Sequence, residues 1–388
     1  AHGAAPAGGA HLASWFPTEA RAAYAAAPAR GKEVFAAYCA RCHSSKLPEK
    51  AFTEFFPDGG CVGPNYLECW DDYWQWTKTD EFRTAMTEIV MQDDFLRGNY
   101  LSTELRVPVT LLETNACSPL ATNAVEGNIW DNFSSASYKS LPSVGTIRVQ
   151  HPYTGEVREY EAPGGGRGFT RPASLISVWS TAPLLLNNTL GPFHWTGSLA
   201  DRLASFESSV RQLLWPATRQ GDFEVVTASG KTHPGIIDRT TASTYLTVAP
   251  GFVPDELNAL TGFFDRFLPN SLLGKIRGMN GGIEIGPIPA GTPINLLTNV
   301  NLEETRRVKR LGLSIIRDLK QLPRDATDEQ AREQFAPLVP QLLEVNKCPD
   351  FVVNRGHYFG TDFLPASERE PALSDEDKLA LIELLKTF

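Results

Sequence analysis

The chain has 388 residues, of which 42% are hydrophobic, and it carries a formal net charge of -9 with a pI near 5.4. An acidic chain of this kind is not expected to have nucleic acid as its main partner, because a polyphosphate needs a basic face. The sequence contains no run of about 18 apolar residues, so we expect no membrane-spanning segment.

The first 29 residues are rich in alanine, glycine and proline. They lack the basic start and apolar stretch of a signal peptide, and their prolines interrupt the helical tendency of the alanines. We therefore predict an irregular lead-in or connector over residues 1–29 and one domain over residues 30–388. Residues 31–38 are predicted to form a short helix that places Val34, Phe35 and Tyr38 on one face.

This helix leads into the motif Cys39-Ala40-Arg41-Cys42-His43. Two thiols at this spacing can add to the vinyl groups of a haem, while the adjacent histidine binds the iron. The alternative is a disulfide or a redox-active Cys-x-x-Cys, but a thioredoxin-like site would follow a strand and not a helix. We expect one covalent c-type haem, with Cys39 and Cys42 as the attachment residues and His43 as an iron ligand.

The middle of the chain is predicted to be mostly helical, with one small β-hairpin. The hairpin strands are residues 146–150 and 157–161, which both alternate and flank a turn that contains glycine. Helical patterns occur at residues 81–91, 199–214, 255–267 and 303–322. The expected fold class is therefore mainly α with minor β.

The last helix is predicted to start at Ser374 as its N-cap, followed by three acidic residues over the positive end of the helix dipole. It extends to Lys386. Its apolar stripe needs a partner surface, and the helix over residues 31–38 is the expected one.

The second axial ligand is expected to be His357, in the glycine-bracketed loop Asn354–Gly360 shortly before the last helix. Residues 344–388 contain no methionine, so His357 has no local thioether competitor. If His357 is instead a surface residue, Met91 or Met279 becomes the candidate ligand. Met86 is expected in a packed helix face, and His151 and His233 on exposed segments. His194 is expected in a buried core.

The four cysteines outside the motif are even in number, which suits disulfides in an oxidising compartment. Cys61 and Cys69 bracket a short loop that contains glycine and proline, so they are the expected first pair. By elimination Cys117 pairs with Cys348. The alternative is that these cysteines are buried and unpaired.

The segment GKEVFAAYCARCHSSK resembles the haem-binding segment of bacterial class I cytochromes c. NYLSTELRVPVTLLETNACSPLATNA, IWDNFSS, RPASLISVWSTAPLLLNNTLGPF and NRGHYFGTDF are similar to the C-terminal half of the bacterial dihaem rubber oxygenases, distant relatives of the dihaem cytochrome c peroxidases. The resemblance runs from Lys32 onward. It implies a periplasmic or secreted bacterial protein with a cytochrome c-like haem core and a large, mostly helical insertion. It also implies His43 as the proximal ligand and His357 as the distal ligand.

The sequence departs from that family in having a single Cys-x-x-Cys-His motif. The family's dioxygen-binding haem lies in an N-terminal half, and residues 2–12 resemble the connector between the halves, so we expect a fragment of a longer chain. Related dihaem proteins also have a histidine in the Thr-Ala-Pro segment, where this chain has Leu186. A catalytic distal histidine from this segment is therefore not expected.

Three functions remain open from the sequence. The first is electron transfer through a six-coordinate haem, with a redox partner protein or a second haem domain as the partner. The second is the electron-storing half of a dihaem oxygenase or peroxidase, and polyisoprene is a substrate only in that case. The third is a structural or sensory haem.

Overall fold

The protein is mainly helical, with small two-stranded antiparallel sheets. The computed structural model describes residues 17–112, 114–115, 135–219, 223–226, 232–249, 283–301, 304, 306–308, 310–312, 314, 322–323, 325–364 and 370–388. The predicted helix at 255–267, Met279 and Cys117 lie outside these residues. Of the predicted helix at 303–322, the residues described between 306 and 314 are helical.

The expected irregular lead-in is in part a helix, α2 (Pro17–Ala26). Pro17 lies at the first helical position, where its missing N–H is no loss. Tyr24 anchors the helix, because its side chain is fully buried and its hydroxyl donates to the carbonyl of Val90 at 2.5 Å. The prediction of an irregular chain is therefore wrong over residues 17–26, because the tertiary contact of Tyr24 stabilises a helix there.

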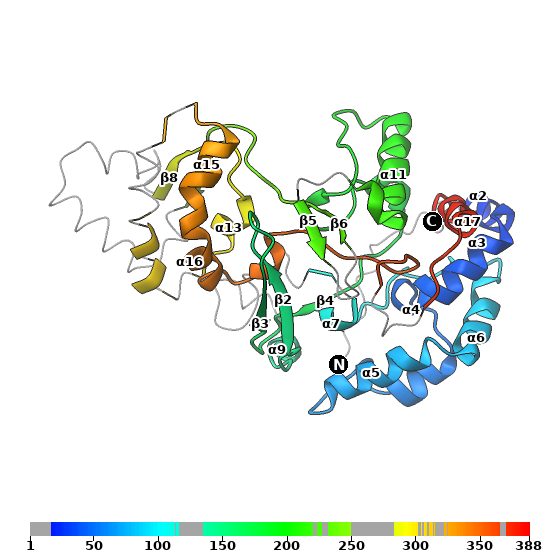
Figure 1. The fold of residues 1–388 in the computed structure, drawn as a ribbon. Coiled ribbons are helices and arrows are strands. Elements are labelled where there is room, and N and C mark those ends of the chain that lie inside the picture. Colours follow the sequence, from blue (N-terminus) through cyan, green and yellow to red (C-terminus); the bar gives the residue numbers. More distant parts are fainter. Residues whose placement is uncertain are drawn as a thin grey trace.

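Helix α3 (Ala29–Val34) crosses the last helix, α17 (Asp375–Leu385), as predicted. Gly31 permits the close approach, since a Cβ there would lie 2.4 Å from the carbonyl oxygen of Ala380. Arg30 adds an ion pair to Asp377 at 2.5 Å. Ser374 caps α17 by accepting from the N–H of Asp377, so the predicted helix start is confirmed. Figure 1 shows these helices of the two ends of the chain side by side.

The main hydrophobic core lies beneath these helices and is rich in aromatic rings. Trp70, Tyr73 and Trp74 are almost completely buried and come from one helix. The next helix buries Phe82 and Met86 and confirms the prediction for 81–91. The helical elements of this part, besides α3, are the π-helical turns η1 (Phe35–Cys39) and η2 (Ala51–Phe55) and the helices α4 (Ala40–His43), α5 (Tyr66–Trp76) and α6 (Asp80–Val90).

The predicted hairpin is confirmed at the predicted residues, as β2 (Thr146–Gln150) and β3 (Val157–Glu161), in register from Thr146 opposite Glu161 to Gln150 opposite Val157. Three more antiparallel pairs are small: β1 (Val107–Pro108) with β4 (Phe169–Thr170), β5 (Phe223–Val226) with β6 (Thr232–Gly235), and β7 (Thr244–Val248) with β8 (Ile283–Ile288). Further helices of the middle region are α7 (Val109–Leu112), α9 (Ala136–Lys139), α10 (Val178–Thr181), η4 (Leu186–Asn188), α11 (Leu199–Leu214) and η5 (Pro216–Thr218). Helix α11 confirms the prediction for 199–214.

A second hydrophobic cluster lies away from α3 and α17 (Figure 1). It joins Val149 of β2 to apolar residues of four short elements and to Val352, which directly follows η9 (Pro349–Phe351). The four elements are α13 (Ile294–Thr298), α15 (Asp328–Phe335), η8 (Ala336–Leu338) and α16 (Val339–Glu344). From η9 the chain returns to α17 of the first core. The loop that carries His357 therefore connects the two cores.

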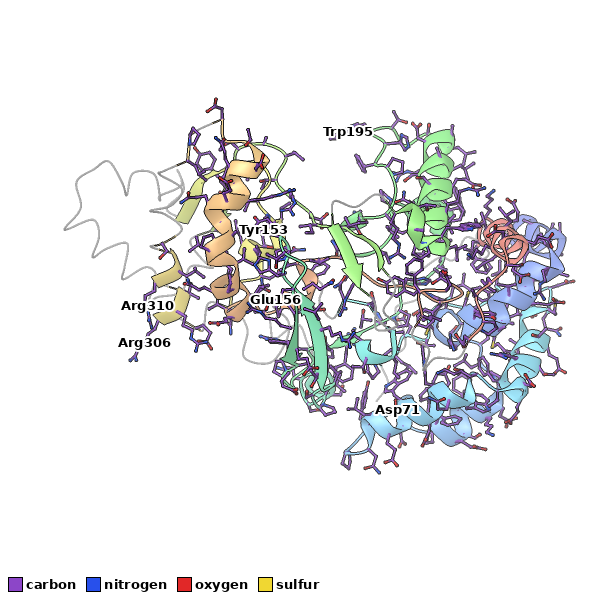
Figure 2. The ribbon with its side chains drawn as sticks, in the orientation of Figure 1. Asp71, Tyr153, Glu156, Trp195, Arg306 and Arg310 are labelled. Atoms are coloured by element: carbon purple, nitrogen blue, oxygen red, sulfur yellow. A yellow bond between two sulfur atoms is a disulfide. The ribbon has the colours of Figure 1, made fainter. Side chains whose placement is uncertain are left out.

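Trp195 protrudes from the loop before α11 (Figure 2). Its side chain is 94% exposed and packs edge-on against Phe193, whose ring centroid lies 5.2 Å away. His194 lies between them in sequence, and its Nδ1 is 3.9 Å from Asp201. The aromatic neighbours therefore do not place His194 in a core, contrary to one expectation from the sequence.

Cys61 and Cys69 form the expected disulfide. Cys348 is also disulfide-bonded, but its expected partner Cys117 lies outside the described residues, so the second pairing stays a prediction. Among the described residues, no helix is both long and apolar enough to span a bilayer.

The disulfides give a stability prediction. Replacing Cys61 and Cys69 together by serine should lower the free energy of unfolding by about 2–3 kcal/mol, since the loop is short. Replacing Cys117 and Cys348 together should lower it by about 5 kcal/mol, because that loop spans more than half of the chain. Denaturant titration measures both values. Four free thiols in the unreduced, denatured parent would contradict the pairing.

Candidate cofactor site

The Cys-x-x-Cys-His motif begins in a π-helical turn and ends with the helix that follows it. The π-helical turn η1 follows α3, and the four residues of α4 complete the motif. Phe35 anchors the turn, because it is fully buried with its ring 5.1 Å from that of Phe388. The chain leaves the helix at Ser44, which is extended. Such π turns occur frequently at functional sites.

The motif cysteines are both free thiols, with Cys42 buried and Cys39 partly buried. Burial raises the pKa of Cys39 to about 12 and that of Cys42 to about 11. A dithiol that exchanges disulfides needs a thiol with a lowered pKa, because the thiolate is the nucleophile. This pair is therefore unlike a thioredoxin-type site.

His43 is held in one tautomer. Its Nδ1 lies 2.9 Å from the carbonyl oxygen of Ala173, and a carbonyl only accepts, so Nδ1 carries the proton and donates. Burial lowers the pKa of His43 to about 4, so the ring is neutral at physiological pH. Nε2 is then the nitrogen with the free lone pair. Histidines that bind metals usually donate their other N–H to a carbonyl or carboxylate in this way.

The carbonyl of Ala173 is fixed by a neighbouring loop. Ser102 donates through its hydroxyl to Pro172 at 2.8 Å, and the backbone N–H of Leu175 donates to Leu101 at 3.2 Å. Asn99 is fully buried and accepts from the N–H of Leu101 at 2.9 Å. The loop 99–104 therefore holds the carbonyl of Ala173 where it accepts from Nδ1 of His43.

His357 lies in the predicted glycine-bracketed loop, and the loop is anchored from a distant part of the chain. Asn115 donates to the carbonyls of Asp350 and Val353 at 2.6 and 3.1 Å. Its amide oxygen accepts from the N–H of Arg355 at 2.7 Å. One buried side chain thus ties three backbone groups before His357.

Gly356 should be irreplaceable in this loop. Its φ is +117°, and a Cβ would lie 2.3 Å from Thr114 Oγ1 and 2.5 Å from Thr114 Cα. Gly356→Ala should lower the free energy of unfolding by about 2–4 kcal/mol through strain and overpacking. Gly59→Ala is the matched control, with φ +82° and nothing near its Cβ, and should lower it by about 1 kcal/mol. Equal losses in denaturant titration would show that the contact with Thr114 does not matter.

The rings of His43 and His357 lie opposite each other, with centroids 6.4 Å apart and planes inclined by 38°. Two imidazoles that bind one metal ion from opposite sides have centroids roughly 6 Å apart, since each bond is about 2 Å and each ring centre about 1 Å further back. Burial lowers the pKa of His357 to about 3, and repulsion from His43 and Arg219 adds to this. Two neutral imidazoles thus meet at a separation that fits a shared metal ion.

The donor set fits a haem better than a bare ion. Within the described ranges, no group of three or more histidine, cysteine or acidic side chains is placed to hold a metal ion. Two histidines can fill the two axial positions of a haem, whose macrocycle supplies the other ligands of the iron. Nδ1 of His357 is also buried without a hydrogen-bond partner among the described residues, which costs about 1–3 kcal/mol. An orphaned ring nitrogen of this kind is typical of a ring kept for ligand binding.

A buried ion pair connects the motif to the C-terminal part of the chain. Arg41 donates to both carboxylate oxygens of Glu370, at 2.6 and 2.7 Å, and both side chains are 1% exposed. The guanidinium carbon lies 4.6 Å from the ring centre of Trp74 and 5.1 Å from that of Phe359. Phe359 in turn lies 5.7 Å from His357. The second residue between the motif cysteines therefore supports the distal loop.

The other predicted candidates are placed elsewhere. Met86 is in the core face of α6, and Met91 is the C-cap of that helix. His151 was expected to be exposed but is 6% exposed, because its Nδ1 accepts from the N–H groups of Tyr153 and Thr154 in the hairpin turn. His233 was expected in a loop and lies in β6. Among the described histidines, His357 is the one that meets the ring of His43.

Sequence reasoning missed the residues that support the site: Arg41, Asn99, Asn115, Ala173, Arg219 and Glu370. Each acts through a contact distant in sequence or through a backbone carbonyl, and neither leaves a local pattern. Arg41 alone had a signal, since it lies inside the motif.

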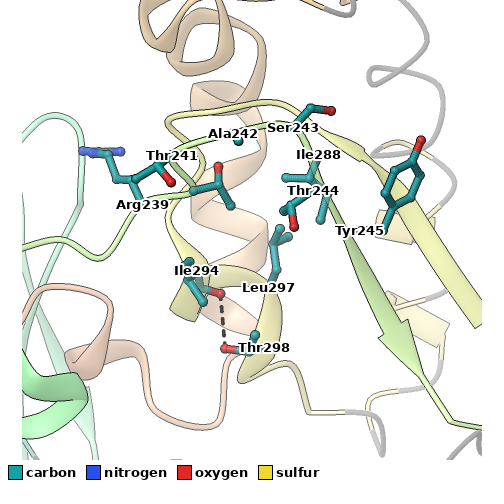
Figure 3. Close-up of a pocket in the computed structure, with 11 residues that line it drawn as sticks. Arg239, Thr241, Ala242, Ser243, Thr244, Tyr245, Ile288, Ile294, Leu297 and Thr298 are labelled. Atoms are coloured by element: carbon teal, nitrogen blue, oxygen red, sulfur yellow. Dashed lines mark hydrogen bonds between the residues drawn. The ribbon is translucent and has the colours of Figure 1, made fainter. Parts of the chain in front are cut away.

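A pocket of about 380 Å³ lies between the start of β7, Ile288 of β8 and α13 (Figure 3). Hydroxyl groups dominate its polar lining, and Arg239 is its charged residue. As far as the structure describes it, the lining has no histidine, cysteine or carboxylate. We assign no chemistry to this pocket, and it shares no residue with the site around His43.

Comparison of the chain with protein-family models, with curated proteins and with solved structures gives no match.

Proposed function

We propose that this chain carries one c-type haem, bound covalently through Cys39 and Cys42 with His43 and His357 as axial ligands, and that it transfers single electrons. The observation that carries the proposal is the 6.4 Å separation of two neutral imidazoles beside two free thiols. When bound, the haem would supply one-electron iron chemistry. With both axial positions filled, no open iron site remains for a substrate.

The protein's own residues perform three tasks in this proposal. Ala173 fixes the tautomer of His43, so that the lone pair of Nε2 is available. Asn115 and Gly356 hold the loop of His357 opposite it. The buried surroundings keep both histidines neutral, which favours metal binding over protonation.

We also propose that the two cores correspond to a cytochrome c-like haem unit and a large insertion. The packing of α3 on α17, with the motif directly after α3, supports the haem unit. The disulfide Cys61–Cys69 supports a location outside the reducing cytosol, in the periplasm or secreted.

A second candidate function is the electron-storing half of a dihaem oxygenase or peroxidase. Three of the four stretches that resemble the rubber oxygenases contribute residues to the candidate site. They supply Asn99 and Asn115, the acceptor Ala173, and His357. This convergence favours the family resemblance, and the partner would then be a second haem domain. A polyisoprene substrate would belong to that complete protein.

Intact mass and haem staining after maturation in a bacterial periplasm test the proposal. The chain should carry one haem that survives denaturation, and Cys39→Ala with Cys42→Ala should abolish the covalent attachment. The reduction potential should lie below that of His/Met cytochromes. Mixing the reduced protein with oxygen, peroxide or a polyisoprene emulsion should give slow reoxidation without products. Multiple turnovers by this chain alone would contradict the six-coordinate assignment.

A further inference from the structure

Arg219 is a buried cation in contact with the loop of the expected distal ligand. Arg219 directly follows η5 and is 4% exposed. Its Nη2 donates to the carbonyl of His357 at 3.2 Å. Its Nε donates to the carbonyl of Gln212 at 3.0 Å, and its guanidinium carbon lies 5.2 Å from the ring centre of Tyr358.

The partners of Arg219 in the described part of the chain are neutral: three carbonyl oxygens and Tyr358. No aspartate or glutamate among the described residues pairs with it, whereas the equally buried Arg41 has Glu370. Desolvation accordingly lowers the pKa of Arg219 below the usual value. An arginine nevertheless keeps its charge in a protein.

A buried charge whose described partners are all neutral is unfavourable, so its position calls for a physical reason. This one lies at the backbone of His357 and acts electrostatically on that ring. At the iron of the proposed haem, a nearby positive charge disfavours the oxidised state, which carries one more positive charge than the reduced state. Low local polarity makes such an interaction stronger than at the surface.

We propose that Arg219 is the residue that tunes the redox site, raising its reduction potential through the charge it holds against the loop of His357. The proposal rests on the haem with two histidine ligands described above. It assigns Arg219 a positioning and electrostatic role, without contact to the iron. The electron enters and leaves through the haem, and no bond of Arg219 changes.

Three substitutions in the haem-loaded full chain separate charge from hydrogen bonding. Arg219→Lys keeps the charge and a donor, Arg219→Gln keeps only a donor, and Arg219→Met keeps neither. Potentiometric titration should show a reduction potential about 59 mV lower in the Gln and Met variants. This corresponds to a roughly tenfold shift of the redox equilibrium toward the oxidised form. The redox equilibrium constant of the Lys variant should stay within about threefold of that of the parent. Arg211→Met is the control, because it removes an exposed charge that solvent already screens.

Electron paramagnetic resonance of each variant must show the parent's low-spin signal, so that the potentials compare the same ligation. A shift in the Met variant alone would assign the effect to the hydrogen bond on His357 and overturn the proposal, as would equal shifts in all three variants or unchanged potentials in all three. If the Met variant takes up no haem, the Lys and Gln pair decides the same question. Failure of the proposed function would be distinct, since the parent itself would then lack haem or bind carbon monoxide.

Discussion

His357→Ala should convert the haem-loaded protein from a low-spin species that does not bind carbon monoxide to one whose ferrous form binds it nearly stoichiometrically. The reason is geometric, because the ring of His357 lies 6.4 Å from that of His43 and occupies the side of the site that an exogenous ligand would need. Electronic and electron paramagnetic resonance spectra measure the change in spin state. Carbon monoxide titration measures the open position.

His194→Ala is the matched control for this substitution. It removes an imidazole from the loop before α11, where Phe193 and Trp195 are exposed, and should leave the spectra of the parent unchanged. If His357→Ala keeps the parent low-spin spectrum, the second ligand lies elsewhere. Met91 at the end of α6 and Met279 then become the candidates to be substituted next.

Elements whose signal is local could be predicted from the sequence. The hairpin β2–β3 follows from alternation around a glycine-containing turn, and α17 follows from Ser374 and the acidic residues after it. The motif Cys39–His43 is local as well, since two thiols and a histidine lie within five residues, and its role in haem attachment stays a prediction. The glycines around His357 predicted a loop, and Gly356 in this loop has a positive φ.

The rest depends on contacts that a single sequence does not reveal. Helix α2 is stabilised by the contact of Tyr24 with Val90, although the prolines and glycines of residues 1–29 predicted an irregular chain. His151 is buried because a turn wraps its Nδ1, not because its neighbours are apolar. The partner of Arg41 lies 329 residues away. Propensity and periodicity describe neighbours along the chain, so they miss such pairs.

The buried pair of Arg41 and Glu370 gives the largest expected effect of a single substitution on stability. Glu370→Gln should lower the free energy of unfolding by about 3–5 kcal/mol, because it leaves the guanidinium charged and desolvated without its partner. The geometry supports the upper part of this range, since the pair is bidentate and both side chains are 1% exposed. Denaturant titration of the variant against the parent measures the loss.

The control and the rescue variant separate burial from simple loss of an ion pair. Glu104→Gln breaks the pair with Arg171, which has a similar 2.8 Å contact but half-exposed side chains, and should lower the free energy of unfolding by less than about 1 kcal/mol. Combining Glu370→Leu with Arg41→Met removes both charges and should recover most of the stability lost by Glu370→Gln, because apolar replacements need no counter-charge. If the double variant is instead the least stable, the contacts of the Arg41 stem with Trp74 and Phe359 stabilise the site more than the charges do.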